Sequence, residues 1–231
     1  MKYVLQGLEI DLELKEKVFK PSPHGSQALG SFIKIKKGET VLDIGTGTGL
    51  LAILAAMKGG LVSATDILSE AVELTRTNAN KNNVVIDVRQ GDIISPFTDK
   101  KFDVIIANIP QEILSPQLKK KYSAEIITGM HGGENGNEVL LKTLNMCPGV
   151  MHKNSRLYIV VYSMSDARKS FEYIVNNFNV QFINFYTGPV KDFVYENKEW
   201  YEKQALEGKV SIYKVNDLYY ADLYVFELRL K

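Results

Sequence analysis

A ten-residue segment, Val41–Leu50, places the strongest constraint on what this chain can fold into. Its sequence is Val-Leu-Asp-Ile-Gly-Thr-Gly-Thr-Gly-Leu, so an apolar run leads directly into three alternate glycines and then into a second apolar run. Glycine adopts backbone conformations that other residues avoid, and it lets a ligand approach the main chain closely. A helix that begins at such a turn offers free backbone N–H groups. The segment therefore predicts a buried strand, a tight turn and a helix, with a ligand at the turn.

The rest of the chain alternates in the same way between apolar strands and helices. Strands are predicted at residues 40–44, 61–66, 84–89, 102–107 and 157–163, and helices at residues 50–58, 69–80, 138–146 and 166–177. These strands are apolar on both faces, which is typical of a parallel sheet covered by helices on both sides. Near the termini the pattern predicts leading strands within 3–14, a helix over 27–35, a strand over 180–187, a helix over 198–206 and an aromatic strand over 218–228.

Composition and charge exclude several classes of protein. The chain has 231 residues, 45% hydrophobic and 24% charged, as expected for one elaborated domain. Lys and Arg number 28 against 27 Asp and Glu, and a net charge of +1 provides no overall field for a polyanion. The single cysteine, Cys147, excludes an intrachain disulfide, and His24, His131 and His152 lack metal-ligand spacing, so no metal is predicted. Apolar runs are too short for a signal peptide or a membrane span, which predicts a cytoplasmic protein without a membrane partner.

The spacing of the glycines argues against a dinucleotide ligand. A dinucleotide fold favours the pattern G-x-G-x-x-G, which would place its third glycine at position 50, and that residue is leucine. The observed pattern is G-x-G-x-G, with Asp43 two residues before the first glycine. A carboxylate at that position would repel a diphosphate and attract a cationic amino or sulfonium group.

Acidic residues also end the next two predicted strands. Asp66 lies at the distance along the chain at which a carboxylate accepts the hydroxyl groups of a ribose. Gly91, Asp92 and Ile93 follow the third strand, where a carboxylate or a neighbouring amide can meet an adenine amino group. Three acidic strand ends in succession are more specific than the glycines alone. The alternative is a tight strand–helix turn that binds nothing.

This constellation resembles the class I S-adenosylmethionine-dependent methyltransferases. The resemblance implies a Rossmann-like, seven-stranded, mostly parallel α/β sheet of order 3-2-1-4-5-7-6, with the last strand antiparallel, helices on both faces and a short N-terminal β extension. It also implies S-adenosylmethionine as cofactor, with S-adenosylhomocysteine as product. We expect residues 1–35 to flank the pocket and residues 36–231 to form the methyltransferase domain. The cofactor residues that the resemblance implies are Asp43, Gly45, Thr46, Gly47, Gly49, Asp66, Ile67, Asp92, Ile93 and Asn108.

The fourth strand is followed by Asn108-Ile109-Pro110-Gln111, which resembles the Asn-Pro-Pro-Tyr motif of methyltransferases that modify amide or exocyclic amino nitrogens. There the Asn side-chain oxygen accepts N–H bonds from the acceptor, and the aromatic ring stacks on it. The resemblance implies catalytic roles for Asn108, Pro110 and Gln111. Ile109 replaces the first proline and Gln111 the aromatic residue, which weakens the expectation of a flat, stacked acceptor. In the alternative interpretation, Asn108 and Pro110 only turn the chain.

Two further segments resemble the HemK-like glutamine methyltransferases. Residues 132–136 match their Gly-Gly-x-Asp-Gly segment, with Asn135 in place of the aspartate. Phe19-x-Pro21, followed by Ser26, is similar to a segment ahead of the first strand in that group and in the small-domain (MTS) ribosomal RNA methyltransferases. Phe19, Pro21, Ser26 and Ile109 are therefore candidate substrate-pocket residues. The alternatives are an ordinary surface loop and a stiff connection.

Three functions remain open from the sequence. The first is in-line methyl transfer to a nitrogen of a protein side chain or small molecule. The second is an RNA base N-methyltransferase acting on rRNA or tRNA, for which Lys119–Lys121 could contact phosphates. The third is a non-catalytic subunit that binds S-adenosylmethionine. The near-zero net charge favours the first over the second.

Overall fold

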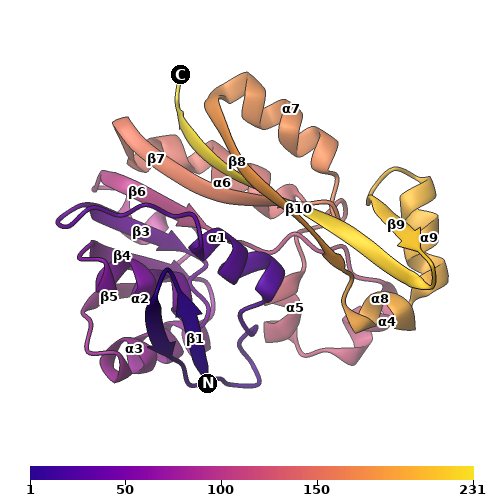
Figure 1. The fold of residues 1–231 in the computed structure, drawn as a ribbon, viewed down its shortest axis with the longest axis horizontal. Helices are drawn as coiled ribbons and strands as arrows, with labels where there is room; N and C mark the ends of the chain where they lie inside the picture. The colour runs from indigo at the N-terminus through magenta and orange to yellow at the C-terminus, as the bar shows by residue number, and fades with distance from the viewer.

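A twisted sheet with helices on both faces forms the centre of the molecule (Figure 1). The computed structural model describes residues 1–231, apart from the side chain of His24. The strands of the sheet are β3 (Thr40–Ile44), β4 (Leu61–Asp66), β5 (Ile86–Gln90), β6 (Phe102–Ala107), β7 (Met151–Tyr162), β8 (Phe178–Pro189), β9 (Ile212–Val215) and β10 (Leu218–Leu230). The helices are α1 (Ala28–Gly30), α2 (Leu50–Met57), α3 (Ser69–Lys81), α4 (Pro116–Lys121), α5 (Ala124–Met130), α6 (Glu138–Met146), α7 (Ala167–Asn177), α8 (Asp192–Glu196) and α9 (Lys198–Leu206).

The order of the strands confirms the predicted topology. The main path is β5-β4-β3-β6-β7-β10-β8, which is the order 3-2-1-4-5-7-6 when these seven strands are numbered along the chain. β10 is antiparallel to both β7 and β8, whereas β3 to β7 are parallel. The short strand β9 adds an antiparallel pairing with β10 that the sequence did not predict.

An antiparallel hairpin precedes the sheet, as the leading strands predicted. It consists of β1 (Lys2–Leu5) and β2 (Leu8–Asp11), joined by Gln6 and Gly7 with φ angles of 51° and 79°. Positive φ at both turn residues is typical of tight hairpin turns. Apolar side chains of the hairpin, including the fully buried Ile10, pack into the same core as α2.

Alternate residues of each central strand face opposite layers of the core. Val41 and Ile106 pack toward α2 and the hairpin, and Leu42 and Ile105 pack toward α6 and α7. Both faces of the sheet are covered by apolar side chains, because the strands are apolar on both sides. The parallel register pairs Ile44 with both Thr65 and Ala107, so β3, β4 and β6 end at a common edge. The loops that follow these strands therefore meet above that edge.

The connection after residue 20 differs from the predicted helix over 27–35. Residues Pro23–Gln27 form one π-helical turn, and the α-helix that follows spans only Ala28–Gly30. Gly30 packs closely against two leucines. A Cβ on Gly30 would lie 3.0 Å from the side chain of Leu5 and 3.1 Å from that of Leu51. Tertiary packing therefore selects a short helix where the apolar spacing favoured a longer one.

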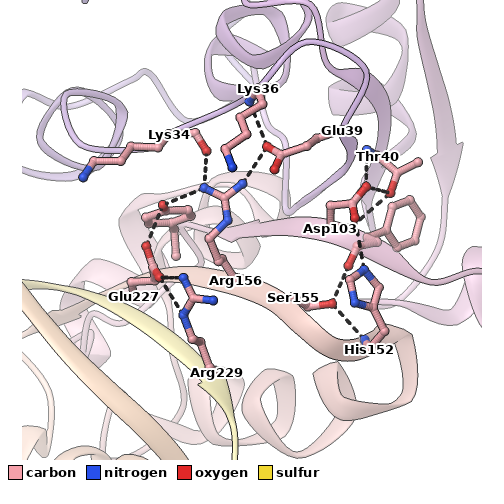
Figure 2. Close-up of polar contacts among 12 residues, drawn as sticks. Lys34, Lys36, Glu39, Thr40, Asp103, His152, Ser155, Arg156, Glu227 and Arg229 are labelled. Atoms are coloured by element: carbon pink, nitrogen blue, oxygen red, sulfur yellow. Dashed lines mark hydrogen bonds and ion pairs between the residues drawn. The ribbon is translucent and has the colours of Figure 1, made fainter.

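A partly buried ionic network at the opposite end of the sheet links Glu39 before β3, Arg156 of β7 and the carboxyl end of the antiparallel β10 (Figure 2). Arg156 pairs with Glu39 at 2.6 Å, and the Tyr158 hydroxyl donates to Glu227 at 2.7 Å. Burial and the neighbouring Glu227 raise the pKa of Tyr158 to about 12, so the phenol stays protonated and keeps donating. Arg229 completes the network by pairing with Glu227 at 2.6 Å. These charges are partnered, and we assign them a structural role.

Candidate functional site

A cavity of about 500 Å³ opens where the loops after β3, β4, β5 and β6 meet. Its walls collect residues from widely separated parts of the chain, from Val18 to Lys142. The predicted residues that line it are Phe19, Pro21, Ser26, Asp43, Gly45, Thr46, Gly47, Asp66, Ile67, Asp92, Ile93, Asn108, Ile109 and Pro110. The two predicted site residues outside this lining are Gly49 and Gln111.

The three glycines of the turn after β3 have different surroundings. Gly45, Gly47 and Gly49 all have positive φ, at 67°, 56° and 85°. The walls of the cavity include Gly45 and Gly47, so a side chain there would narrow the space for a ligand. Gly49 instead lies against α3, where a Cβ would stand 3.0 Å from the Thr75 side chain. The third glycine is therefore required by helix packing.

Asp66 stabilises the glycine turn by accepting a backbone hydrogen bond from it. Its Oδ2 accepts the backbone N–H of Gly47 at 2.9 Å, and its Oδ1 accepts that of Leu68 at 3.0 Å. The side chain is buried at the end of β4, and burial raises the pKa of Asp66 above its ordinary value. Each carboxylate oxygen has a further lone pair, so Asp66 can also accept hydroxyl groups of a ligand.

Asp43 and Thr46 carry polar atoms without partners. Oδ2 of Asp43 and Oγ1 of Thr46 are buried and make no hydrogen bond. Burial raises the pKa of Asp43 to about 7, with repulsion from Asp66 adding to the effect. A buried acceptor without a donor is costly, and a cationic ligand group would remove that cost. This part of the cavity fits the amino-acid end of S-adenosylmethionine, which carries an ammonium and a sulfonium.

We expect the Asp43→Asn variant to be more stable than the wild type, by a margin that grows with pH. A rise in the Asp43 pKa from 3.8 to about 7 on folding costs the ionised form about 4 kcal/mol. That cost is absent below the unfolded pKa, increases as pH rises, and is complete above the folded pKa. The advantage of the variant should therefore increase by about 2 kcal/mol between pH 5.5 and pH 8. Urea unfolding of both proteins at the two pH values measures this, and a margin independent of pH would contradict the burial of a titrating carboxyl.

The far end of the cavity contains a cation that the sequence did not predict. Lys142 of α6 forms an ion pair with Oδ2 of Asp92. Both side chains are about half exposed, and both line the cavity. Ile93 has a φ of 54°, and its carbonyl accepts the Thr65 hydroxyl at 2.7 Å. The hydrogen bond holds this strained residue at the cavity wall.

Asn108 joins two segments that the sequence suggested separately. Its Nδ2 donates to the Ser26 hydroxyl at 2.9 Å. Ser26 belongs to the Pro-rich connection and Asn108 to the loop after β6, yet both line the cavity. The contact orients the Asn108 amide and leaves its Oδ1 available as an acceptor.

Gln111 faces the protein interior. It is 4% exposed, its Nε2 donates to the Val160 carbonyl at 2.9 Å, and its Oε1 accepts the Tyr162 N–H at 3.0 Å. Both polar groups of Gln111 are therefore used by the backbone of β7. This contact fastens residues 108–112 to the sheet, a role that sequence spacing could not reveal.

The glycine segment over residues 132–136 packs tightly behind the same loop. The Gly132 N–H donates to the Glu112 carbonyl at 3.0 Å, and a Cβ on Gly136 would lie 2.8 Å from the Gln111 carbonyl oxygen. Asn135, at the position of the related aspartate, donates from its side chain to Glu138 at 2.8 Å and is outside the cavity lining. The glycines thus permit close backbone packing.

The basic run after residue 118 is largely neutralised. Lys119 pairs with Glu134 at 3.1 Å, and Lys121 pairs with Glu196 at 2.6 Å. The run lies in α4, which begins after Ser115 accepts the Leu118 N–H. Little unpaired positive charge is left on this helix for phosphate contacts.

The two histidines with described side chains, His131 and His152, lie far from each other. His131 lines the cavity and its Nδ1 lies 3.2 Å from the Glu112 carbonyl, whereas His152 contacts Asp103 at the opposite end of the sheet. The side chain of His24 lies outside the described part of the structure. Among the described side chains, no three His, Cys, Asp or Glu residues gather as a metal site. Across the same part of the chain, no helix combines the length and apolarity needed to cross a bilayer.

The chain has the fold of the class I methyltransferases. The structure matches the 16S rRNA N2 G1207 methyltransferase of T. thermophilus with a TM-score of 0.61 at 16% identity, over all of this chain and 50% of that one. It matches a methyltransferase from Pyrococcus furiosus with a TM-score of 0.55 at 20% identity, over 94% and 88% of the two chains. At such identities the matches establish the fold.

Sequence relatives identify the family. The profile described as "Methyltransferase small domain" matches residues 20–131. A "Putative protein N5-glutamine methyltransferase" of Methanocaldococcus jannaschii is 31% identical over 162 residues, which are 70% of this chain and 80% of that protein. The ribosomal protein L11 methyltransferase of Dictyoglomus thermophilum is 38% identical over 112 residues, and that match covers only 37% of its length. This chain belongs to the small-domain group of S-adenosylmethionine-dependent methyltransferases.

Proposed function

We propose that this enzyme methylates a nitrogen atom of a protein side chain, with Asn108 holding the acceptor. The supporting observation is the Asn108 amide, oriented by Ser26 at the cavity wall with its Oδ1 free to accept an N–H. The similarity to a protein named as an N5-glutamine methyltransferase supports a carboxamide nitrogen as the acceptor atom. A small amide-bearing metabolite is the alternative acceptor within the same chemistry.

We further propose how the cavity residues bind the cofactor. The turn with Gly45 and Gly47 would surround the methionine part, Asp43 and Thr46 would receive its cationic groups, and Asp66 would accept the ribose hydroxyls. Asp92 and Ile93 would meet the adenine edge, which leaves Gly49 in a packing role. When bound, S-adenosylmethionine supplies a methyl group that is already electrophilic.

The remaining chemistry consists of positioning. Asn108 would accept an N–H from the acceptor and direct the nitrogen lone pair toward the methyl carbon. Pro110 stiffens the loop, and we assign Gln111 a positioning role because its amide is bound to β7. Ile109, Phe19 and Pro21 would exclude water from the site.

The same arrangement extends to the domain boundaries. We propose that residues 1–35 flank the pocket and that residues 36–231 form the methyltransferase domain. We also propose a cytoplasmic location.

RNA is the weaker acceptor candidate. Two of the three lysines in the basic run are paired with glutamates, and the net charge is +1. Nonspecific affinity for RNA depends on unpaired cations that neutralise phosphates. A purely cofactor-binding subunit is also weaker, because the acceptor-side Asn108 is oriented and accessible from the cavity.

Cofactor binding and transfer of a labelled methyl group test the proposal together. S-adenosylhomocysteine at 100 times its Kd should stabilise the protein by about 2.7 kcal/mol, whereas NAD should have no effect. Labelled S-adenosylmethionine, incubated with fractionated protein, RNA and metabolite pools, should mark the protein pool. Stabilisation by NAD alone would refute the cofactor assignment, and label confined to RNA would refute the protein acceptor.

A further inference from the structure

A second cavity, of about 350 Å³, adjoins the first on the acceptor side. The two share a wall that includes Asn108, Ile109 and Pro110. The remaining lining comes from the Pro-rich connection, from Gln111 and Glu112, and from the C-terminal half of the chain, which includes Val160, Tyr162, Lys191 and Leu223. A group bound in this second cavity would lie next to Asn108.

Glu112 places a buried negative charge in the lining of the second cavity. The residue is 5% exposed, and its Oε1 pairs with the ammonium of Lys191. Its Oε2 is buried and makes no hydrogen bond. A buried carboxylate oxygen without a donor is costly unless a ligand supplies one. This unpartnered oxygen indicates that the cavity receives a hydrogen-bond donor.

Nearby hydroxyl groups do not supply the donor that Oε2 lacks. The Tyr201 hydroxyl donates to the Ile113 carbonyl at 2.8 Å. Burial and the charge of Glu112 raise the pKa values of Tyr162 and Tyr201, so both phenols keep their protons, yet neither hydroxyl donates to Oε2. The donor that Oε2 of Glu112 lacks is therefore expected from the methyl-acceptor substrate.

Lys191 provides a complementary donor beside this carboxylate. Its side chain is about one-third exposed, so its ammonium can form hydrogen bonds beyond the one to Glu112. The ammonium also lies 4.5 Å from the centroid of the Phe19 ring. That contact covers a face of Phe19 that could otherwise stack on a nucleobase. The pair presents one acceptor and one donor with no net charge.

We infer that Glu112 and Lys191 bind the main chain of one acceptor residue, with Glu112 accepting the N–H of that residue and Lys191 donating to its carbonyl. In an extended chain the N–H and C=O of one residue point to the same side, so they present one donor and one acceptor without net charge, which matches the pair. This inference rests on the proposed function, because it places main chain beside the nitrogen that Asn108 holds. The acceptor class is accordingly a polypeptide, and Glu112 and Lys191 are specificity-determining residues.

Binding of three probes to the protein saturated with S-adenosylhomocysteine tests this inference. N-acetyl-glutamine N-methylamide has peptide groups on both sides of a carboxamide side chain, butyramide has the carboxamide alone, and guanosine is the nucleoside probe. We expect the capped glutamine to bind more tightly than butyramide in NMR titrations. Glu112→Gln and Lys191→Met should each weaken the binding of the capped glutamine by about tenfold and leave the binding of butyramide unchanged. If the pair had only a structural role, the two substitutions would weaken the binding of both probes equally.

Glu196→Gln is the matched control, because it removes an exposed ion pair on α8 without altering either cavity lining. It should bind all probes as the wild type does. Equal binding of the capped glutamine to wild type and Glu112→Gln would overturn the inference, as would binding of guanosine alone or of none of the three. A protein that fails to bind S-adenosylhomocysteine at all contradicts the proposed function instead, so the two failures are distinguishable.

Discussion

The Asn108→Ala variant should transfer methyl groups about 100-fold more slowly than the wild type, because the acceptor nitrogen loses the oxygen that orients it. S-adenosylhomocysteine should still stabilise the variant, since the glycine turn and Asp66 are untouched. Initial rates with labelled S-adenosylmethionine, combined with thermal shifts, separate the two effects. The acceptor is the pool or peptide that the wild-type enzyme labels.

Ser26→Ala is the matched control for this prediction. It removes the hydroxyl that receives the Asn108 Nδ2 at 2.9 Å but leaves the Asn108 oxygen in place. Its rate should fall by about tenfold or less, because the amide is then less firmly oriented. An Asn108→Ala protein that turns over at the wild-type rate would refute the role assigned to Asn108.

Gly132→Ala should be the most destabilising single-methyl change in the loop behind the acceptor site. A Cβ on Gly132 would stand 2.7 Å from Cα of Gln111 and would also overlap the Gly136 carbonyl oxygen. Both neighbours are main chain, so no side-chain rotation relieves the clash. We expect a loss of about 3 kcal/mol in the free energy of unfolding, measured by urea denaturation. Methyl transfer should fall as well, because the displaced Gln111 belongs to the loop that carries Asn108.

Gly149→Ala provides the comparison within the same protein. Its Cβ would meet Ile94 at 3.5 Å, an ordinary contact, and its effect should stay within about 0.5 kcal/mol. If both alanine variants unfold at the same urea concentration, the close packing of residues 132–136 against the acceptor loop is wrong.

The elements that carry the candidate cofactor site were predictable from local sequence. The strands over 40–44, 61–66 and 102–107 were predicted to the residue, because each is a short segment rich in apolar residues that begins after a charged residue or a glycine. The helices α4, α5 and α8 were not predicted. They are short, at five to seven residues, and helices of this length depend on packing and capping more than on periodicity.

The acceptor side was less predictable. The motif identified Asn108 and Pro110, and the Pro-rich connection suggested Ser26, yet nothing in the spacing indicated that Asn108 and Ser26 are bonded. Gln111 was expected at the acceptor by analogy with an aromatic residue, and the structure shows its amide bound to β7. A side chain's direction after a strand depends on the neighbouring strand, which the motif does not encode.

The sequence by itself determined the parallel sheet, the glycine turn and the acids that end successive strands. These features depend on backbone freedom and on apolar periodicity, which act over a few neighbouring residues. Only the tertiary structure decided that Lys142 pairs with Asp92, that Gln111 fastens the acceptor loop, and that Glu112 meets Lys191 across 79 positions while one of its oxygens stays unpaired. Such contacts arise when the sheet brings distant segments to one edge, and their burial and partners exist only in the folded chain.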